Sequence, residues 1–584
     1  MAHRPPVRTA VSNVLVIGTG AAGLRAAIAA HAAGCEVTVI GKRARKDAHS
    51  VLAAGGINAA LCTHDPEDSW QQHYADTLRE GYFLSDPRVV ELMAREAPQA
   101  IAELDEWGCE FARTKDGRID QRFFGAHTYR RTCYAGDFTG RAMIKALGQQ
   151  VAALGIEVVE GQYVSSLLVE DGTCFGAYAF DLNSGERTVF VADAVVLAAG
   201  GHTRIWRRSS SRRDENNGDG MYLALRAGCR LSDMELVQFH PTGMVMPEEV
   251  AGTLVTEAVR GEGGRLYNSR GERYMERYDP RRMELSTRDR VALANYTEIH
   301  EGRGGPNGGV FLDLSHIGKD VILKRLPRMY RQFIEYQMLD ISSAPMEVAP
   351  TAHYSMGGIV VEPDTHATEV EGLYAAGEVT AGLHGANRLG GNSLAETMVF
   401  GRRAGEAAAA RSRSREVLLR SRGSIAAAGE ELDSLIKPGS CFARPLQRAV
   451  RNAMWEHCGV VRTGDGLNEG VVEIDDLASS LGDVDVRPSS EGYADLAHVL
   501  DLRAALVSAR ATLLGALERR ETRGCHFRTD YPEPDESLKV NIRCELTGDG
   551  ELELARDPVP PVPSELEQWA TPAQELEAAG RLVE

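Results

Sequence analysis

Closely spaced cysteines are absent from this sequence. Ten cysteines are scattered over 584 residues, and the nearest pair, Cys441 and Cys458, stands 17 positions apart. Without a C-x-x-C spacing, we do not expect this chain to hold a zinc knuckle or an iron–sulfur cluster. Scattered unpaired cysteines are typical of a reducing cytosol rather than of a disulfide scaffold. We therefore expect no metal site and a cytoplasmic location.

Long apolar runs and an excess of basic residues are also missing. No stretch reaches the roughly 18 apolar residues of a membrane span, and MAHRPPVRTAVS at the start lacks the apolar core of a signal peptide. Lys and Arg total 65 against 83 Asp and Glu, which gives a net charge of −18. This balance argues against a nucleic-acid-binding protein. Any membrane association should come through a partner, and an anionic substrate would depend on local basic residues.

The chain is organised around a predicted β-α-β unit near its start. The apolar run Val14–Ile17 suits a strand buried on both faces, and an alanine-rich helix follows, ending near Gly34. A second apolar strand, Val37–Ile40, completes the unit. Between the first strand and the helix stand three glycines in G-x-G-x-x-G spacing, at residues 18–23.

This glycine spacing has a physical reason. Gly18 permits a tight turn, Gly20 lets a pyrophosphate approach the backbone, and Gly23 lets helix and strand pack closely. The start of the helix presents unpaired N–H groups to the phosphates. The alternative is a merely tight βα turn, but the strand–helix context favours a dinucleotide site. The acidic ribose partner expected after the second strand is replaced by Gly41-Lys42, which argues against simple NAD binding.

The rest of the chain alternates strand and helix signals. Two helices separated at Asp86-Pro87 are followed by a string of strands over 156–200, with a turn at 183–185. Another buried strand is predicted at Leu373–Ala376. Helical periodicity from about 406 to 525 is broken by turns near Pro438-Gly439 and 463–466, and the acidic, proline-rich tail past 545 suggests a surface wrap or partner contact.

Several motifs in order resemble the flavoprotein subunits of succinate dehydrogenase and fumarate reductase. They are AHSVLAAGGINAAL with His49, QRFFG at 121–125, HPTG at 240–243, TEAVRGEGG at 256–264, STRDR at 286–290, AHYSMGG at 352–358, HGANRLGGNSL at 384–394 and ERRETRGCHFRTDYPEPDE at 518–536. The resemblance covers Val14 to about Glu536. It implies an α/β fold: a Rossmann-like FAD-binding domain with an inserted α+β capping domain, followed by a C-terminal helical domain. The expected division is 1–233 and 354–405 for the FAD-binding domain, 234–353 for the capping domain, 406–536 for the helical domain and 537–584 for the tail.

The resemblance implies FAD bonded covalently through His49, where an ordinary loop histidine is the alternative. The implied cofactor set is Gly18, Thr19, Gly20, Ala21, Ala22, Gly23, Gly41, Lys42, His49, Ser50, Ala54, Gly55, Gly56, Asp219, Glu378, Arg388, Ser393 and Leu394. Asp219 and Ser393 have an alternative role as helix caps. Ala54 stands where many family members carry Gln or Glu.

The substrate that the resemblance implies is a four-carbon dicarboxylate with two negative ends. Arginine suits a carboxylate because its planar fork donates two parallel hydrogen bonds. By resemblance, His240 and Thr256 hold one carboxylate, and His353 and Arg388 hold the other. The alternative for both histidines is a purely structural role in their loops. The segment MVMPEEVAGTLV between His240 and Thr256 looks longer than in the family.

For catalysis, Arg288 resembles the family's proton-transfer arginine. An arginine has a reference pKa above ~12, so this role needs a carboxylate relay that resupplies the proton. Asp289 and Glu257 are the relay candidates, and Glu257 and Arg260 are both placed to shape the proton path. The alternative is that Arg288 and Asp289 form a surface ion pair.

We therefore expect an FAD-dependent enzyme that interconverts succinate and fumarate. It should pass electrons to an iron–sulfur subunit and, through membrane-anchor subunits, to quinone at the cytoplasmic face of the cell membrane. L-aspartate oxidase and a soluble fumarate reductase are enzyme alternatives; His49 and the QRFFG loop argue against the first. A flavoprotein that has lost its chemistry should lack the substrate-binding side chains, which are all present here.

Overall fold

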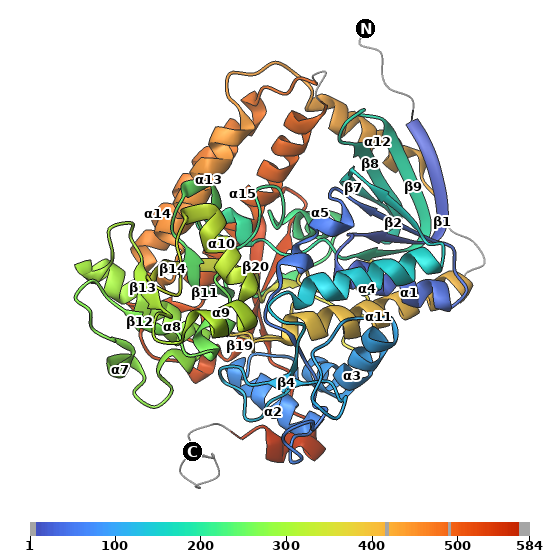
Figure 1. The fold of residues 1–584 in the computed structure, drawn as a ribbon. Helices are drawn as coiled ribbons and strands as arrows, with labels where there is room; N and C mark the ends of the chain where they lie inside the picture. Colours follow the sequence, from blue (N-terminus) through green and yellow to red (C-terminus); the bar gives the residue numbers. More distant parts are fainter. Residues whose placement is uncertain (1–6, 415–419, 489–491, 572–584) are drawn as a thin grey trace.

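A seven-stranded sheet, here called the main sheet, forms the centre of one half of the molecule (Figure 1). The computed structural model describes residues 7–414, 420–488 and 492–571. The strand order is β6-β2-β1-β9-β8-β7, and β16 pairs with β9. The bounds are β1 Val7–Ile17, β2 Val37–Gly41, β6 Glu157–Glu160, β7 Gln162–Glu170, β8 Thr173–Asp181, β9 Arg187–Leu197 and β16 Leu373–Ala375. β1 runs parallel to β2 and β9, as expected for a β-α-β unit.

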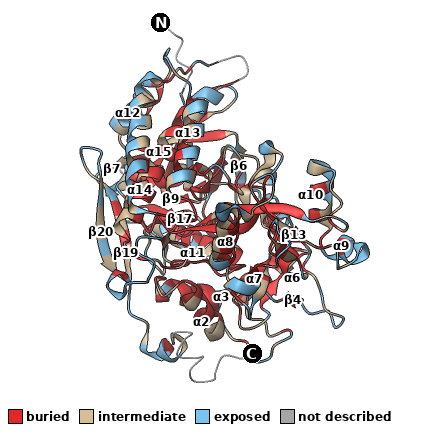
Figure 2. Cartoon of the chain, turned by 90° about the vertical axis from the view of Figure 1, so that its left-hand side faces the viewer, coloured by how far each residue is buried: buried red, intermediate tan, exposed pale blue. Residues whose placement is uncertain are grey.

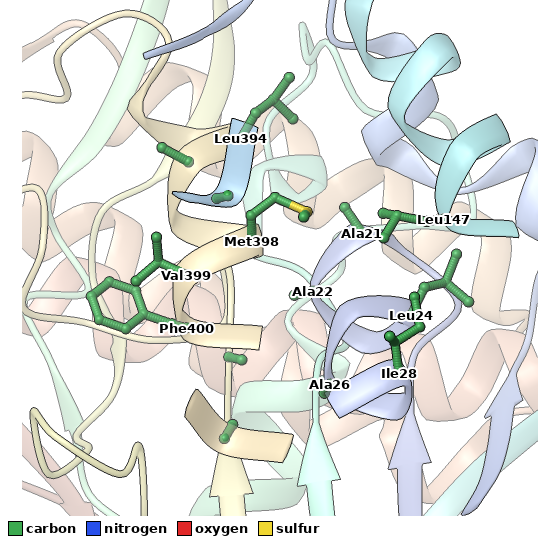
Figure 3. Close-up of a cluster of buried hydrophobic side chains, with 14 of the residues drawn as sticks. Ala21, Ala22, Leu24, Ala26, Ile28, Leu147, Leu394, Met398, Val399 and Phe400 are labelled. Carbon is green, nitrogen blue, oxygen red and sulfur yellow. The ribbon is translucent and has the colours of Figure 1, made fainter. Parts of the chain in front are cut away.

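Helices cover both faces of this sheet. Val14 and Val16 of β1 face the cluster formed by α1 (Ala21–Ala32), α4 (Thr139–Ala153) and α11 (Asn392–Ser414), as Figure 3 shows for the α1, α4 and α11 side chains. Leu15 and Ile17 face the opposite cluster, which includes α5 (Asp219–Ala227). The run Val14–Ile17 is thus buried on both faces, as its unbroken apolar sequence predicts, whereas Val7–Val11, the first half of β1, lies mostly exposed.

α1 and α11 pack closely because their contact surfaces carry small residues. A Cβ on Gly405 would overlap the carbonyl of Ala26, and one on Gly401 would crowd that of Ala22. Next to them lie α2 (Trp70–Glu80) and α3 (Pro87–Glu106), and the Asp86 side chain caps α3 through the N–H groups of Arg88 and Val89. The predicted break between these two helices is confirmed.

A second sheet, here called the cap sheet, lies beside the main sheet (Figure 1). Its order is β11 (Val237–Met244), β14 (Met346–Ser355), β13 (Val310–Asp313) and β12 (Arg265–Tyr267). The helices of this region are α6 (Ala258–Gly261), α7 (Met275–Tyr278), α8 (Arg288–Glu298), α9 (Lys319–Arg325) and α10 (Pro327–Gln337). The region is inserted between β9 and β16, which are neighbours in the main sheet.

The C-terminal helices are α12 (Arg422–Ser434), α13 (Ala443–His457), α14 (Gly464–Ser479) and α15 (Ala494–Glu518). The turn predicted over 463–466 is wrong in part, since only Thr463 lies outside the helix: its hydroxyl caps α14 by accepting from Gly466 N–H at 3.0 Å. α11 runs unbroken past residue 406, where the sequence predicts the start of the helical domain. Short ladders join β17 (Val461–Arg462) to β18 (Phe527–Arg528), and β3 (Ile57–Asn58) and β4 (Gln121–Arg122) to β5 (Thr132–Cys133).

The described tail past residue 545 lies mostly on the surface, as predicted, but it begins in a hairpin that the composition did not indicate. β19 (Val540–Leu546) and β20 (Leu552–Pro558) form a hairpin that joins β10 (Leu231–Ser232) and β15 (Gly358–Ile359). Ile542 and Cys544 alternate into the core, a period-two pattern that the charged composition obscures. Figure 2 shows mostly exposed and intermediate residues along β20 at the edge of the molecule. The last part of the tail, 572–584, lies outside the described residues.

A buried ion cluster ties this tail to the body. The Arg519 guanidinium lies within 2.7 Å of Glu235, 3.1 Å of Asp233 and 3.2 Å of Glu521, and all four side chains are at most 6% exposed. It also donates to the carbonyls of Leu538 and Val540. No membrane-crossing helix occurs in the described ranges.

Candidate active site

One elongated cavity gathers nearly all of the predicted site residues. It holds about 1700 Å³ of empty space, including the part open to solvent, and it runs from the carboxyl ends of the main-sheet strands to the cap sheet. Every predicted cofactor residue except Gly23 lines it, as do His240, Thr256, Glu257, Arg288, His353 and Arg388. Gly23 and Arg260 lie outside the lining.

The glycine turn after β1 is as tight as its sequence predicts. Gly18 has φ +127°, and a Cβ there would overlap the carbonyl of Ala198. A Cβ on Gly23 would overlap the carbonyl of Gly18, so this glycine serves the packing of α1 against the turn rather than the cavity wall. Gly20 precedes α1 with no side-chain cap, and Ala21 and Ala22 line the cavity. The N-terminus of α1 is therefore presented to the cavity as an anion site.

A charged group lies where the second strand ends. Lys42 Nζ lies 2.8 Å from Asp219 and 3.2 Å from Asp501, and the Tyr163 hydroxyl donates to Asp501 at 2.8 Å. Burial alone would lower the pKa of Lys42, but the two aspartates raise it. The Asp219 side chain does not cap α5, and its second oxygen, Oδ1, is buried without a hydrogen-bond partner in the described structure. This oxygen is suited to accept from a nucleotide hydroxyl.

His49 is held by a carboxylate from another loop. Its Nδ1 lies 2.9 Å from Oε1 of Glu215, whose side chain is 6% exposed. Nearby, Ser50 Oγ accepts from the N–H of Ala21 at the start of α1. Ala54 to Gly56 form the cavity wall, and Arg122 donates to the carbonyl of Gly55.

The Ser393 hydroxyl contacts Arg388 rather than capping α11. The helix begins one residue earlier, at Asn392, and Arg388 Nη1 donates to Ser393 Oγ at 3.2 Å. Glu378 accepts from the N–H of Ser355 at 3.1 Å, and it lines the same stretch of cavity.

The cap-sheet end of the cavity carries the predicted carboxylate-binding side chains. His240 on β11 and His353 on β14 lie edge to face, with ring centroids 5.3 Å apart. Burial lowers the pKa of both well below the usual value. The charges of Arg288 and Arg260 add to the effect at His240, and those of Arg388 and Arg288 at His353, so both imidazoles are neutral. The hydroxyl of Ser210 is 2.9 Å from His353 Nδ1.

Gln238 joins the two arginines of this site, a contact that no sequence motif indicated. Its Oε1 accepts from Arg288 Nη1 and from Arg388 Nη2, each at 2.9 Å. Arg388 also lies over the Tyr354 ring, 4.4 Å from its centroid. Two guanidinium groups are thus fixed beside two neutral histidines, an arrangement that suits a dianion.

Arg288 is buried and contacts Glu257, so the surface ion pair with Asp289 is wrong. Nε and Nη2 of Arg288 donate to Glu257 Oε2 at 2.8 and 2.6 Å. Asp289 is not in the relay position, because its oxygens accept from Tyr82 at 2.8 Å and Asn387 at 3.0 Å. Arg260 lies behind Glu257 at 3.9 Å and donates to the carbonyl of Glu284 at 2.6 Å.

The long segment between His240 and Thr256 folds back on itself. Gly252 N–H donates to Met244 at 2.8 Å, and Thr253 accepts from Met244 N–H at 2.9 Å. The residues between Met244 and Gly252 therefore form a closed loop, and Leu254 and Thr256 return to the cavity wall.

The shape and the polar groups of this cavity fit a bound flavin dinucleotide. The glycine turn leaves room for a pyrophosphate, and the unpartnered oxygens of Asp219 and Glu215 stand ready for donors. The remaining cavity continues to the two arginines of the cap end. Gln238, Tyr163, Asp501 and Glu215 complete this site and carry no recognisable motif signal.

Comparisons with known proteins show which family the chain resembles. A family model described as an FAD binding domain matches residues 13–394, and one described as the fumarate reductase flavoprotein C-term matches residues 447–568. The chain is 46% identical to a subunit of the fumarate reductase (CoM/CoB) of Methanothermobacter marburgensis, over 91% of this chain and 96% of that protein. It is 37% identical to the succinate dehydrogenase flavoprotein subunit of Rickettsia conorii, over 94% and 95%.

Solved structures show the same likeness over the whole length. The structure of Mycobacterium smegmatis Sdh1 in complex with UQ1 contains a chain that is 39% identical, with a TM-score of 0.89 and 98% of each chain covered. Family models, near-full-length relatives and a solved structure agree with the fold. The chain therefore belongs to the succinate dehydrogenase/fumarate reductase family of FAD-dependent flavoprotein subunits.

Proposed function

We propose that this chain interconverts succinate and fumarate at the cap-sheet end of the cavity. The observation that carries the proposal is the convergence of Arg288, Arg388, His240, His353 and Thr256 on one stretch of cavity wall. Together they offer forked donors and neutral imidazoles to the two carboxylates of a C4 dianion. FAD, when bound, supplies the hydride acceptor or donor.

The protein's own part is to orient the acid and to move a proton. His240 with Thr256 and His353 with Arg388 would hold opposite carboxylates, which fixes the central carbon–carbon bond in one place. Arg288 would exchange the second proton with the substrate carbon. Glu257 is the relay group, because its carboxylate contacts Arg288 directly and Arg260 stands next behind it.

The proposal includes covalent attachment of FAD through His49. The ring lines the same cavity as the glycine turn, and Glu215 contacts Nδ1, which leaves Nε2 as the nitrogen for attachment. Acid precipitation of the purified protein tests this directly. Flavin fluorescence that stays with the precipitated polypeptide supports attachment, and flavin released wholly to the supernatant contradicts it.

Electrons would leave through an iron–sulfur subunit. Membrane-anchor subunits and quinone would follow, with this chain at the cytoplasmic face of the cell membrane. The chain's likeness to the Mycobacterium smegmatis Sdh1 structure with UQ1 supports a quinone-linked complex. Co-purification from the native membrane, followed by assays for succinate-dependent quinone reduction, tests the partners and the direction together.

The 46% identity to the CoM/CoB fumarate reductase protein favours a second candidate. In it, the dicarboxylate chemistry is the same and the electron donors are the CoM and CoB of that relative's name. Fumarate-dependent consumption of CoM and CoB by the native complex would favour this candidate, whereas succinate–quinone activity would favour the first. L-aspartate oxidation without succinate oxidation would contradict both.

A further inference from the structure

We propose that Glu215 is the positioning residue for covalent attachment of the flavin. It would hold His49 with its Nδ1–H directed at the carboxylate, so that Nε2 carries the lone pair, and it would offset the positive charge that the ring gains on bonding. The inference rests on the proposed attachment at His49. It adds a second residue to that reaction.

Glu215 is fixed before any cofactor enters. Its Oε1 accepts from the backbone N–H of Arg212 at 2.7 Å and lies 2.9 Å from His49 Nδ1. The second oxygen, Oε2, is buried without a hydrogen-bond partner in the described structure. The nearest guanidinium groups, of Arg43 and Arg212, stand 3.9 and 4.0 Å from it. The carboxylate is therefore committed to the histidine rather than to a close arginine.

This contact selects one form of the imidazole. A neutral ring carries one N–H, and a carboxylate can only accept, so the proton stays on Nδ1 and the lone pair on Nε2. Burial would raise the pKa of Glu215, yet its contact with His49, with the Arg212 N–H and with the Arg212 charge holds it at about 2. The negative charge is thus present throughout the physiological pH range.

The bond-forming step itself needs no reagent other than FAD and the protein. Nε2 forms a bond to the 8-methyl carbon of the flavin, and that carbon loses one hydrogen as a proton. The electron pair of the broken C–H bond passes to the flavin ring, which also takes up the proton and is left reduced by two electrons. The imidazole then carries both Nδ1–H and a carbon on Nε2, and hence a positive charge beside Glu215. Fumarate, a substrate of the proposed reaction, reoxidises the ring.

The contact with Glu215 also has an opposing effect. Burial would lower the pKa of His49, but Glu215 and then Glu378 raise it, while Arg212 lowers it. Below that pKa, Nε2 is protonated and cannot attack. Attachment should therefore speed up as pH rises and level off above the His49 pKa. Removing the Glu215 charge should move this plateau to lower pH and reduce its height.

The experiment reconstitutes full-length apoprotein with FAD and follows covalent attachment by intact mass and acid-stable fluorescence. Glu215→Gln keeps an acceptor for Nδ1–H but removes the charge, Glu215→Asp tests rescue, and His49→Ala is the negative control. Asp214→Asn is the matched control, because it loses the same charge one residue away, where Asp214 pairs with Arg444 at 3.0 Å.

We expect wild type and Asp214→Asn to attach FAD equally fast. Glu215→Gln should bind FAD but attach it about tenfold more slowly or worse at the plateau, with the pH profile shifted to lower pH. Retained non-covalent FAD shows that the variant folds. An unchanged rate and pH profile in Glu215→Gln would overturn the role of Glu215 and leave attachment at His49 standing. Wild type that holds FAD only non-covalently would overturn both.

Discussion

Arg288 donates two hydrogen bonds to the same oxygen of Glu257, from Nε at 2.8 Å and from Nη2 at 2.6 Å. Burial would raise the pKa of Glu257, but Arg288 and Arg260 hold it well below the usual value. The pair is therefore ionised, and it places an acceptor directly behind the arginine that faces the substrate. Substitution of either residue therefore tests the proposed proton path.

Glu257→Gln should lower succinate-dependent dye reduction by about 10²–10⁴-fold, because the relay loses its acceptor. Arg288→Ala should abolish turnover, and both variants should keep bound FAD. Arg290→Ala is the control, since this side chain is 62% exposed and lies two residues further along α8. Steady-state rates and flavin absorbance measure the two effects separately. Near-normal turnover of Arg288→Ala would refute the proton-transfer role.

Gly18→Ala should destabilise the protein by about 2 kcal/mol or more and deplete it of FAD. Its φ of +127° strains any Cβ, and the added carbon would overlap Ala198 in the neighbouring loop. Gly148→Ala is the matched substitution, because the added Cβ meets open space in α4. Thermal unfolding and FAD content check both variants. A Gly18→Ala variant with full FAD content and unchanged stability would contradict the requirement for glycine in this turn.

Arg519→Met should destabilise the fold by roughly 3–5 kcal/mol, because it leaves Asp233, Glu235 and Glu521 buried without their shared cation. Arg520→Met, on the exposed neighbour, should change stability little. Urea unfolding followed by circular dichroism measures the difference. Equal midpoints for the two variants would mean that the cluster contributes little to holding the tail.

His366 should make the protein less stable in mild acid. Burial lowers its pKa to about 4. Between that value and the ordinary pKa of about 6.5, the unfolded chain binds the proton and the folded chain does not, so stability falls as pH falls through this window. For this one group the loss between pH 8 and pH 5 is about 2 kcal/mol. His366→Gln, which cannot titrate, should show a shallower decline in melting temperature from pH 8 to 5. An unchanged slope would assign the acid sensitivity elsewhere.

Local sequence patterns predicted the features whose structure depends on residues close together in the chain. The glycine turn, the Asp86 cap and the apolar run of β1 depend on neighbours within one element, so their residue types identify them. Gln238 and Glu215 could not be found this way. Each acts on a residue 50 or more positions away, Arg288 and Arg388 in one case and His49 in the other.

The features that local patterns missed have a related cause. The β19–β20 hairpin is stabilised by pairing with β10, more than 300 residues earlier, and its own composition resembles a solvated tail. Asp289 stands next to Arg288 in sequence, yet on a helix consecutive side chains point in different directions. Adjacency along the chain therefore suggested a relay partner that the helix turns towards Tyr82 and Asn387.

The cavity wall draws on residues from Ile17 to Thr397, and β16 takes its place beside β9 only after the whole capping region has been made. A ribosome must therefore release the chain as far as Thr397 before a complete binding site for the dinucleotide exists. Binding of the prosthetic group thus has to follow synthesis of the capping region, because the β-α-β unit that is made first supplies only part of the cavity wall.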